Sequence, residues 1–87
     1  MSAISAAAYM IENAMLFDAH VDRYRLGTRR AIGELLRDHR GSISLREVAR
    51  RAKLSAPFVS DVELGRRSCS TRLLSVYESL DESEKLK

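Results

Sequence analysis

The sequence predicts an all-α domain built from five helices. Two observations support this prediction. Apolar residues recur at steps of three and four through most of the chain, which is the spacing of one helix face. Serines stand directly before several of these stretches, where a hydroxyl can satisfy the first free amides of a helix. With 87 residues, the chain is long enough for one domain with a small core and too short for a separate catalytic or ligand-sensing domain.

The first 26 residues are expected to form a helical extension. Residues 3–24 are rich in alanine and contain no proline or glycine, which favours one long helix. An apolar stripe runs along this helix and includes Met10, Ala14, Phe17, Val21 and Tyr24. Such a stripe can pair two copies of the chain, and we treat these residues as candidate dimerisation residues. Two alternatives stay open, namely packing onto the chain's own domain and a leader that is disordered or binds a partner.

A second helix is expected from Arg29 to about Arg40, after a break at residues 26–28. Gly27 is the breaking residue, and Thr28 is placed to cap the helix that follows. Its core positions are Ile32, Leu35 and Leu36. A loop at residues 41–42 then leads into Ser44, and Ile43 is available as a hydrophobic staple.

Residues 44–65 predict two short helices that meet at a tight turn. Ser44 and Glu47 have the spacing of a capping box, in which each side chain bonds to the other's backbone amide. Ser55 is a suitable N-cap for the second helix, and Pro57 fits its first turn. Gly65 suits the left-handed residue that commonly ends a helix. The buried faces are expected to hold Val48, Ala49, Ala52, Val59 and Val62.

Helices separated by so few residues must cross steeply, and this is the geometry of a helix-turn-helix. The spaced positions Ser44, Val48-Ala49, Leu54-Ser55, Val59-Ser60, Glu63 and Gly65 resemble the lambda-repressor and Cro-like (XRE-type) helix-turn-helix family over roughly residues 32–80. The resemblance implies a lambda-repressor-like helix-turn-helix DNA-binding domain over residues 27–80, which makes five helices together with the N-terminal helical extension. That family favours glycine in the turn and glutamine after the first cap, where this chain has Lys53 and Leu45. The turn is therefore expected to be strained or different in shape.

The resemblance also implies which residues would read DNA bases. Carried over by position, the base readers are Ser55, Ala56, Pro57 and Asp61. Ala56 is able to contact a thymine methyl group, and Asp61 is able to accept a hydrogen bond from a cytosine amino group. For Asp61 the alternative of a solvated acid stays open.

The resemblance further implies an ion pair between Arg37 and Glu63, which would tie the first helix of the domain to the recognition helix.

Basic residues gather in the part of the chain that carries the two short helices. Residues 27–74 contain eleven Arg or Lys and five Asp or Glu, which gives this part a net charge of +6. The net charge of the whole chain is +3, so the rest of the chain is acidic. Such an excess suits contacts to DNA phosphates, which set register and most of the affinity without reading sequence. The candidate phosphate contacts are Arg46, Phe58, Ser60, Arg66 and Arg67.

A last helix is expected through about Leu80, capped by Ser68 or Ser70. Its buried face would hold Leu73, Leu74, Val76, Tyr77 and Leu80. Residues 81–87 carry no core pattern and are expected to form a polar C-terminal tail.

Other chemistry has little support in the sequence. His20 and His39 have no partners at metal-ligand spacing, and the serines lie in no nucleophile motif. We therefore expect neither an enzyme nor a cofactor or metal site. The single cysteine, Cys69, favours a reducing cytoplasm, and the apolar runs are too broken for a membrane span.

The predicted function is sequence-specific binding of double-stranded DNA. The chain would act as a small dimeric transcriptional regulator, a repressor that binds a palindromic operator as a homodimer. The alternative is an antitoxin-like or other protein-interaction module, which covers a partner protein and uses DNA binding only for autoregulation.

Overall fold

The computed structural model describes residues 2–13 and 22–80, with only the backbone described for residues 22–27. These residues form five helices and no strand, which confirms the predicted all-α class for the described part of the chain. The helices are α1 (Ala3–Glu12), α3 (Asp22–Arg40), α4 (Leu45–Ala52), α5 (Ala56–Glu63) and α6 (Thr71–Glu78).

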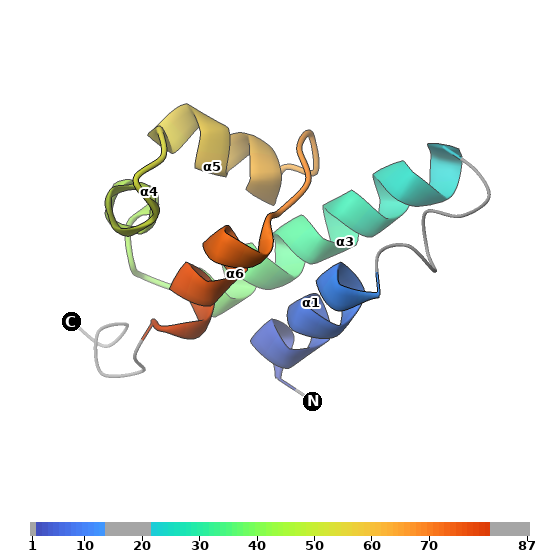
Figure 1. Cartoon of the computed structure of the whole chain (residues 1–87), viewed down its shortest axis with the longest axis horizontal. Coiled ribbons are helices and arrows are strands. Elements are labelled where there is room, and N and C mark those ends of the chain that lie inside the picture. The colour runs from blue at the N-terminus through green and yellow to red at the C-terminus, as the bar shows by residue number, and fades with distance from the viewer. Residues whose placement is uncertain (1, 14–21, 81–87) are drawn as a thin grey trace.

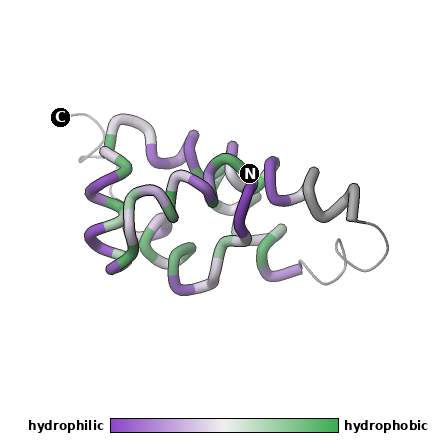
Figure 2. The backbone as a smooth tube through the Cα atoms, turned by 90° about the horizontal axis from the view of Figure 1, so that it is seen from above, coloured by the Kyte–Doolittle hydropathy of each residue, from purple (hydrophilic) through white to green (hydrophobic). Residues whose placement is uncertain are grey.

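The longest helix, α3, is the element on which the others pack. It contacts α1, α5 and α6, while α4 contacts α5 and α6 (Figure 1). In Figure 1, α4 is seen end-on and α5 lies across the page, so these two short helices cross steeply. In Figure 2, the tube changes between hydrophobic and hydrophilic colours within the helices, as expected for elements with one buried face.

The start of α3 differs from the prediction. The helix is continuous from Asp22 to Arg40, so the expected break at residues 26–28 and the expected cap at Thr28 are both wrong. A single glycine costs a helix interior only about 1 kcal/mol, which neighbouring helix formers and tertiary packing offset. Gly27 is therefore an internal residue of α3.

The N-terminal segment also differs. We expected one helix over residues 3–24, but α1 ends at Glu12, and residues 22–24 belong to α3. Asn13 ends α1 with a non-helical backbone (φ −108°, ψ 21°), and its side-chain Nδ2 donates to the carbonyl oxygen of Tyr9 at 2.7 Å. A short polar side chain thus competes with continuation of the helix.

The apolar stripe of α1 packs onto the chain's own domain. Ala7 is fully buried, and Met10 is half-buried against the core, where α1 contacts α3 and α6. Of the other candidate dimerisation residues, Ala14, Phe17 and Val21 lie outside the described residues, as does the side chain of Tyr24. Dimerisation through this region stays a prediction.

Three of the expected helix caps are confirmed. The hydroxyl oxygens of Ser44, Ser55 and Ser70 each accept a hydrogen bond from the backbone amide three residues ahead, at 3.1, 3.2 and 3.1 Å. Pro57 stands in the first turn of α5, as expected. These caps begin α4, α5 and α6 at the predicted places.

The ends of α4 and α5 share one geometry. At the end of α5, Gly65 has φ +79°, and the amide of Arg66 donates to the carbonyl of Asp61 at 2.8 Å. At the end of α4, Lys53 has φ +57°, and the amide of Leu54 donates to the carbonyl of Ala49 at 3.0 Å. Both are Schellman motifs, which need a left-handed residue. The turn between α4 and α5 therefore begins with an ordinary Schellman motif, in which Lys53 takes the strained left-handed conformation.

The core fills the space between α3 and the other helices. Most of its predicted members are buried: Ile32, Leu36, Ile43, Val48, Ala49, Ala52, Val59, Val62, Leu73, Leu74, Tyr77 and Leu80. The closest approach of two helices is at Gly33, where an added Cβ would lie 2.2 Å from the carbonyl oxygen of Glu63. Only glycine allows α5 to end so near α3.

Candidate nucleic-acid interface

The C-terminal end of α5 is fixed by a buried carboxylate. The side chain of Glu63 is 5% exposed and accepts hydrogen bonds from Arg40, from Nε at 2.8 Å and from Nη2 at 2.9 Å. The hydroxyl of Tyr77 also donates to this carboxylate. The hydrogen bond to Glu63 raises the pKa of Arg40, and burial followed by the same carboxylate raises the pKa of Tyr77. Both donors therefore stay protonated at neutral pH.

This arrangement corrects the predicted ion pair. The cation that binds Glu63 is Arg40 in the last turn of α3, whereas Arg37 is exposed. Arg40 also donates from Nη1 to the carbonyl of Ile43 at 2.9 Å, which holds its guanidinium at the junction of α3, α4 and α5. Arg37 lies three residues earlier on α3 and lines a groove together with Arg40 and Glu63, but among the described residues the ion pair of Glu63 is to Arg40.

The first turn of α5 is open to solvent. Ser55 and Pro57 are exposed, and Ala56 is half-buried against the core. The hydroxyl oxygen of Ser55 already caps the helix, which leaves its proton free to donate. Three of the four predicted base readers thus lie together at one end of the helix.

The fourth predicted base reader, Asp61, lies among cations of its own chain. Its two carboxylate oxygens are 3.5 Å from Nη1 of Arg66 and 3.7 Å from Nε of Arg67. These distances are too long for good hydrogen bonds, and the arginine side chains are 71% and 58% exposed. The guanidinium of Arg67 also lies over the ring of Phe58, 5.2 Å from its centre. Asp61 therefore faces two of the predicted phosphate contacts.

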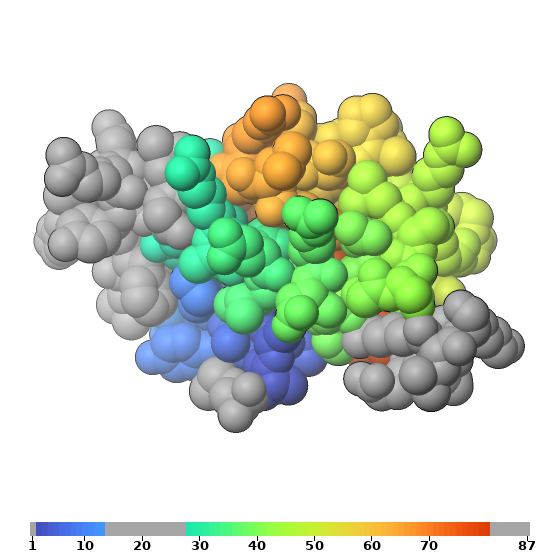
Figure 3. Space-filling view, turned by 180° about the vertical axis from the view of Figure 1, so that it is seen from behind, coloured from blue at the N-terminus to red at the C-terminus, as the bar shows by residue number. Residues whose placement is uncertain are grey.

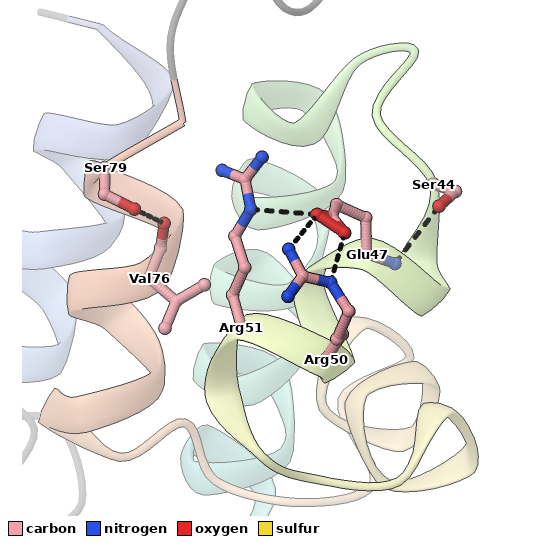
Figure 4. Close-up of polar contacts among 6 residues, drawn as sticks. All are labelled: Ser44, Glu47, Arg50, Arg51, Val76 and Ser79. Atoms are coloured by element: carbon pink, nitrogen blue, oxygen red, sulfur yellow. Dashed lines mark hydrogen bonds and ion pairs between the residues drawn. The ribbon is translucent and has the colours of Figure 1, made fainter.

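The side chain of Glu47 forms ion pairs with two arginines of α4. Its carboxylate accepts hydrogen bonds from Arg50 at 2.7 Å and from Arg51 at 3.1 Å (Figure 4). The hydrogen bond from Arg50 contributes most to lowering the pKa of Glu47 to about 2. The capping box is therefore wrong in one half, because the carboxylate binds arginines in place of the Ser44 amide. In Figure 4, Val76 points from α6 toward Arg51.

The remaining predicted phosphate contacts lie on two sides of α5. Arg46 is exposed in the first turn of α4, and Ser60 borders a groove of about 250 Å³ together with Arg37, Leu45 and Leu64. Figure 3 shows this region of the molecule, where the second half of α3 lies between α1 and the end of α5. The structure thus brings Arg66 and Arg67 together with Asp61, whereas Ser60 borders the groove that Arg40 and Glu63 also line.

Sequence reasoning missed two residues that position α5. Arg40 was an available cation in the last turn of a predicted helix, and Gly33 was an isolated glycine inside a helical pattern, which often marks a close approach. His39 joins α3 to α6 instead, since its Nε2 lies 3.0 Å from the carbonyl oxygen of Tyr77 and must donate to it.

Comparison of the chain with protein-family models, with curated proteins and with solved structures finds no match. Among the described residues, no three His, Cys, Asp or Glu side chains are grouped so that they could hold a metal ion. None of the helices in residues 2–13 and 22–80 is long and apolar enough to cross a membrane.

Proposed function

We propose that the chain binds double-stranded DNA through α4 and α5, used as a lambda-repressor-like helix-turn-helix, and acts in the cytoplasm as a small dimeric transcriptional repressor. One observation supports this most. The first turn of α5 is exposed at Ser55 and Pro57, and exposed cations precede and follow the helix in the chain, with Arg46 on α4 and Arg66 and Arg67 after α5.

The dimensions of the two helices agree with this proposal. Three residues separate α4 from α5, and the eight residues of α5 span about 12 Å, which fits within the major groove of B-DNA. The opposite end of α5 is anchored by the buried Glu63 and by the close contact at Gly33. A helix held at its far end can present its first turn to base edges in a fixed orientation.

The charge around α4 and α5 also favours a polyanionic partner. Residues 45–72 contain seven Arg or Lys and three Asp or Glu, a net charge of +4. Two of the three acids, Glu47 and Glu63, are already bound to arginines, and Glu63 is buried. Approaching phosphates would therefore meet chiefly the cations and Asp61.

The proposed base readers are short, so one copy of α5 would discriminate weakly among sequences. Selectivity would come from two copies on half-sites of a palindrome, about 34 Å apart. The dimer contact is proposed to involve the N-terminal region, which includes the undescribed stretch with Phe17 and Val21.

The deciding experiment is selection of bound sites from a random duplex pool, followed by binding measurements at several salt concentrations. Because each neutralised phosphate releases counterions, Arg66→Ala should weaken binding to all sequences alike and reduce the salt slope by about one. A chain that binds no duplex at low salt would contradict the proposal and would favour a protein-interaction module. A variant that loses only its sequence preference would make Arg66 a base reader.

A further inference from the structure

The helices α1 and α3 and the loop between α5 and α6 enclose a small cavity of about 60 Å³. None of its described lining residues belongs to the first turn of α5. Its lining residues are Ile11, Thr28, Arg29, Ile32, Arg67, Ser68 and Cys69.

Arg29 is the residue that needs explaining. Its Nε atom is buried and has no hydrogen-bond partner. Buried side-chain donors are nearly always paired, and each exception calls for a bound molecule or an unusual role. Arg29 also lines the cavity, so a rotation of its side chain toward a bound acceptor would give this donor a partner.

The polar lining of the cavity selects for an anion. The polar residues that line it are Arg29, Arg67, Thr28 and Ser68, and no Asp or Glu stands among the described lining residues. Guanidinium groups recognise carboxylates through paired hydrogen bonds. A cationic ligand would be repelled by both arginines, and a neutral one would not form an ion pair with Arg29.

The remaining lining is apolar. Ile32 is buried, Ile11 is half-buried, and burial raises the pKa of the Cys69 thiol to about 12, so that it stays neutral at physiological pH. The thiol therefore serves as part of an apolar wall and is not a reactive thiolate. A ligand with a short apolar body beside its charge would match both halves of the cavity.

We propose that this cavity binds a small organic carboxylate, whose oxygens accept hydrogen bonds from Arg29 and whose hydrocarbon part lies against Ile11 and Ile32. The volume of about 60 Å³ admits a short-chain acid such as propionate. Because such a ligand has few atoms, its dissociation constant should lie in the millimolar range.

The position of Arg67 connects this cavity to DNA binding, and this second step depends on the proposed function. Arg67 lines the cavity and is also a proposed phosphate contact, 3.7 Å from Asp61 and stacked on Phe58. A carboxylate that holds Arg67 in the cavity competes with the DNA phosphate for the same guanidinium. Bound ligand should therefore weaken DNA binding.

The test is an NMR titration of the full chain with sodium propionate, with propionamide as the neutral analogue and sodium chloride as the ionic-strength control. We expect saturable shifts at the backbone amides of Ile32 and Cys69 with propionate only. Arg29→Gln should weaken binding at least about tenfold, since a charge-assisted pair is lost. Arg30→Gln is the matched control, because Arg30 is the exposed neighbour outside the cavity lining, and it should leave binding unchanged.

The proposal is overturned by equal shifts with propionamide, by shifts that do not saturate, or by unaltered affinity in Arg29→Gln. If Arg29→Gln fails to fold, the ratio of propionate to propionamide affinity in the unsubstituted chain decides alone. The DNA arm repeats the duplex measurement with saturating propionate, where we expect several-fold weaker binding. Unchanged DNA affinity with intact propionate binding overturns the competition step only, and absence of any DNA binding overturns the proposed function while the carboxylate site stands.

Discussion

Arg40 and Glu63 join the last turn of α3 to the last turn of α5 through two charge-assisted hydrogen bonds of 2.8 and 2.9 Å. The carboxylate is 5% exposed and the arginine side chain 17% exposed, so water screens the pair very little. A buried pair of this kind is sensitive to loss of one partner, because the other is left as an uncompensated charge. The orientation of α5 depends on both side chains.

Arg40→Ala should therefore lower the free energy of unfolding by about 3–5 kcal/mol, the usual consequence of stranding a buried charge. The exposed Arg37 is the matched control, and Arg37→Ala should change the free energy of unfolding by less than about 0.5 kcal/mol. Urea denaturation followed by circular dichroism measures both. Equal losses in the two variants would mean that Arg37 supports Glu63 in solution. The double variant Arg40→Ala with Glu63→Ala should recover part of the loss.

The contrast between these arginines shows where sequence reasoning stops. The caps at Ser44, Ser55 and Ser70 were predictable because each depends on residues only three positions apart. The ion-pair partner of Glu63 depends on how α3 and α5 are oriented, because Arg40 and Glu63 are 23 residues apart in the sequence. No local pattern distinguishes Arg37 from Arg40 as that partner. Local signals also failed at Gly27, where propensity was too weak to end α3.

The candidate site was predictable to the same extent. The exposed first turn of α5 and the exposed Arg66 and Arg67 follow from the positions of Ser55 and Gly65. The pairing of Asp61 with both arginines does not, because it depends on the side-chain conformations of all three residues around that turn. Arg29, whose Nε is buried, lines a cavity made by three separate segments, which no sequence pattern brings together.

Gly33→Ala tests the close contact between α3 and α5. In an ordinary helix this change is stabilising by about 1 kcal/mol. Here the added Cβ would lie 2.2 Å from the backbone oxygen of Glu63, so the helices must separate. We expect a loss of about 1–3 kcal/mol, as for overpacked cores. Glu34→Ala, one residue further along the same helix and exposed, should stay within about 0.5 kcal/mol of the unsubstituted chain in the same melts. A stabilised Gly33→Ala would mean that the helices are further apart.

Lys53→Gly should stabilise the chain. Lys53 is in the left-handed region at φ +57°, where a side chain costs about 1 kcal/mol and glycine is free of that strain. The thermal midpoint should rise by several degrees, since about 1 kcal/mol shifts a domain of this size by roughly 4–8 °C. Arg50→Gly, which also removes an exposed cation of the same segment but from the right-handed last turn of α4 and together with its hydrogen bonds to Glu47, should lower the midpoint. Opposite signs in the two variants are the diagnostic result.

Glu47 should make stability depend on acid pH. Its pKa is lowered from 4.5 to about 2 in the folded chain, mainly by the hydrogen bond from Arg50. Since the folded pKa lies below the unfolded one, this stabilisation is fully present above about pH 4.5 and is lost as the pH falls toward 2. Glu47→Gln should therefore lower the thermal midpoint at pH 7, and its difference from the unsubstituted chain should vanish near pH 2. A difference in thermal midpoint that is the same at both pH values would show that these arginines do not stabilise the ionised carboxylate of Glu47.

Asp61→Asn separates the two possible roles of the acid on the proposed recognition helix. Its carboxylate lies 3.5 and 3.7 Å from Arg66 and Arg67, so it competes with phosphates for both guanidiniums. Removing that charge should strengthen binding to every duplex by a similar factor, roughly three- to tenfold at low salt, and steepen the salt dependence. Glu78→Gln changes the net charge equally from an exposed position at the end of α6, and it should have a smaller effect.

If Asp61 instead accepts a hydrogen bond from a cytosine amino group, the asparagine variant keeps its general affinity and loses preference at one base pair, by about 1–3 kcal/mol. Duplex competition with single-base variants of the selected site distinguishes the two results, because only the second depends on the identity of the base.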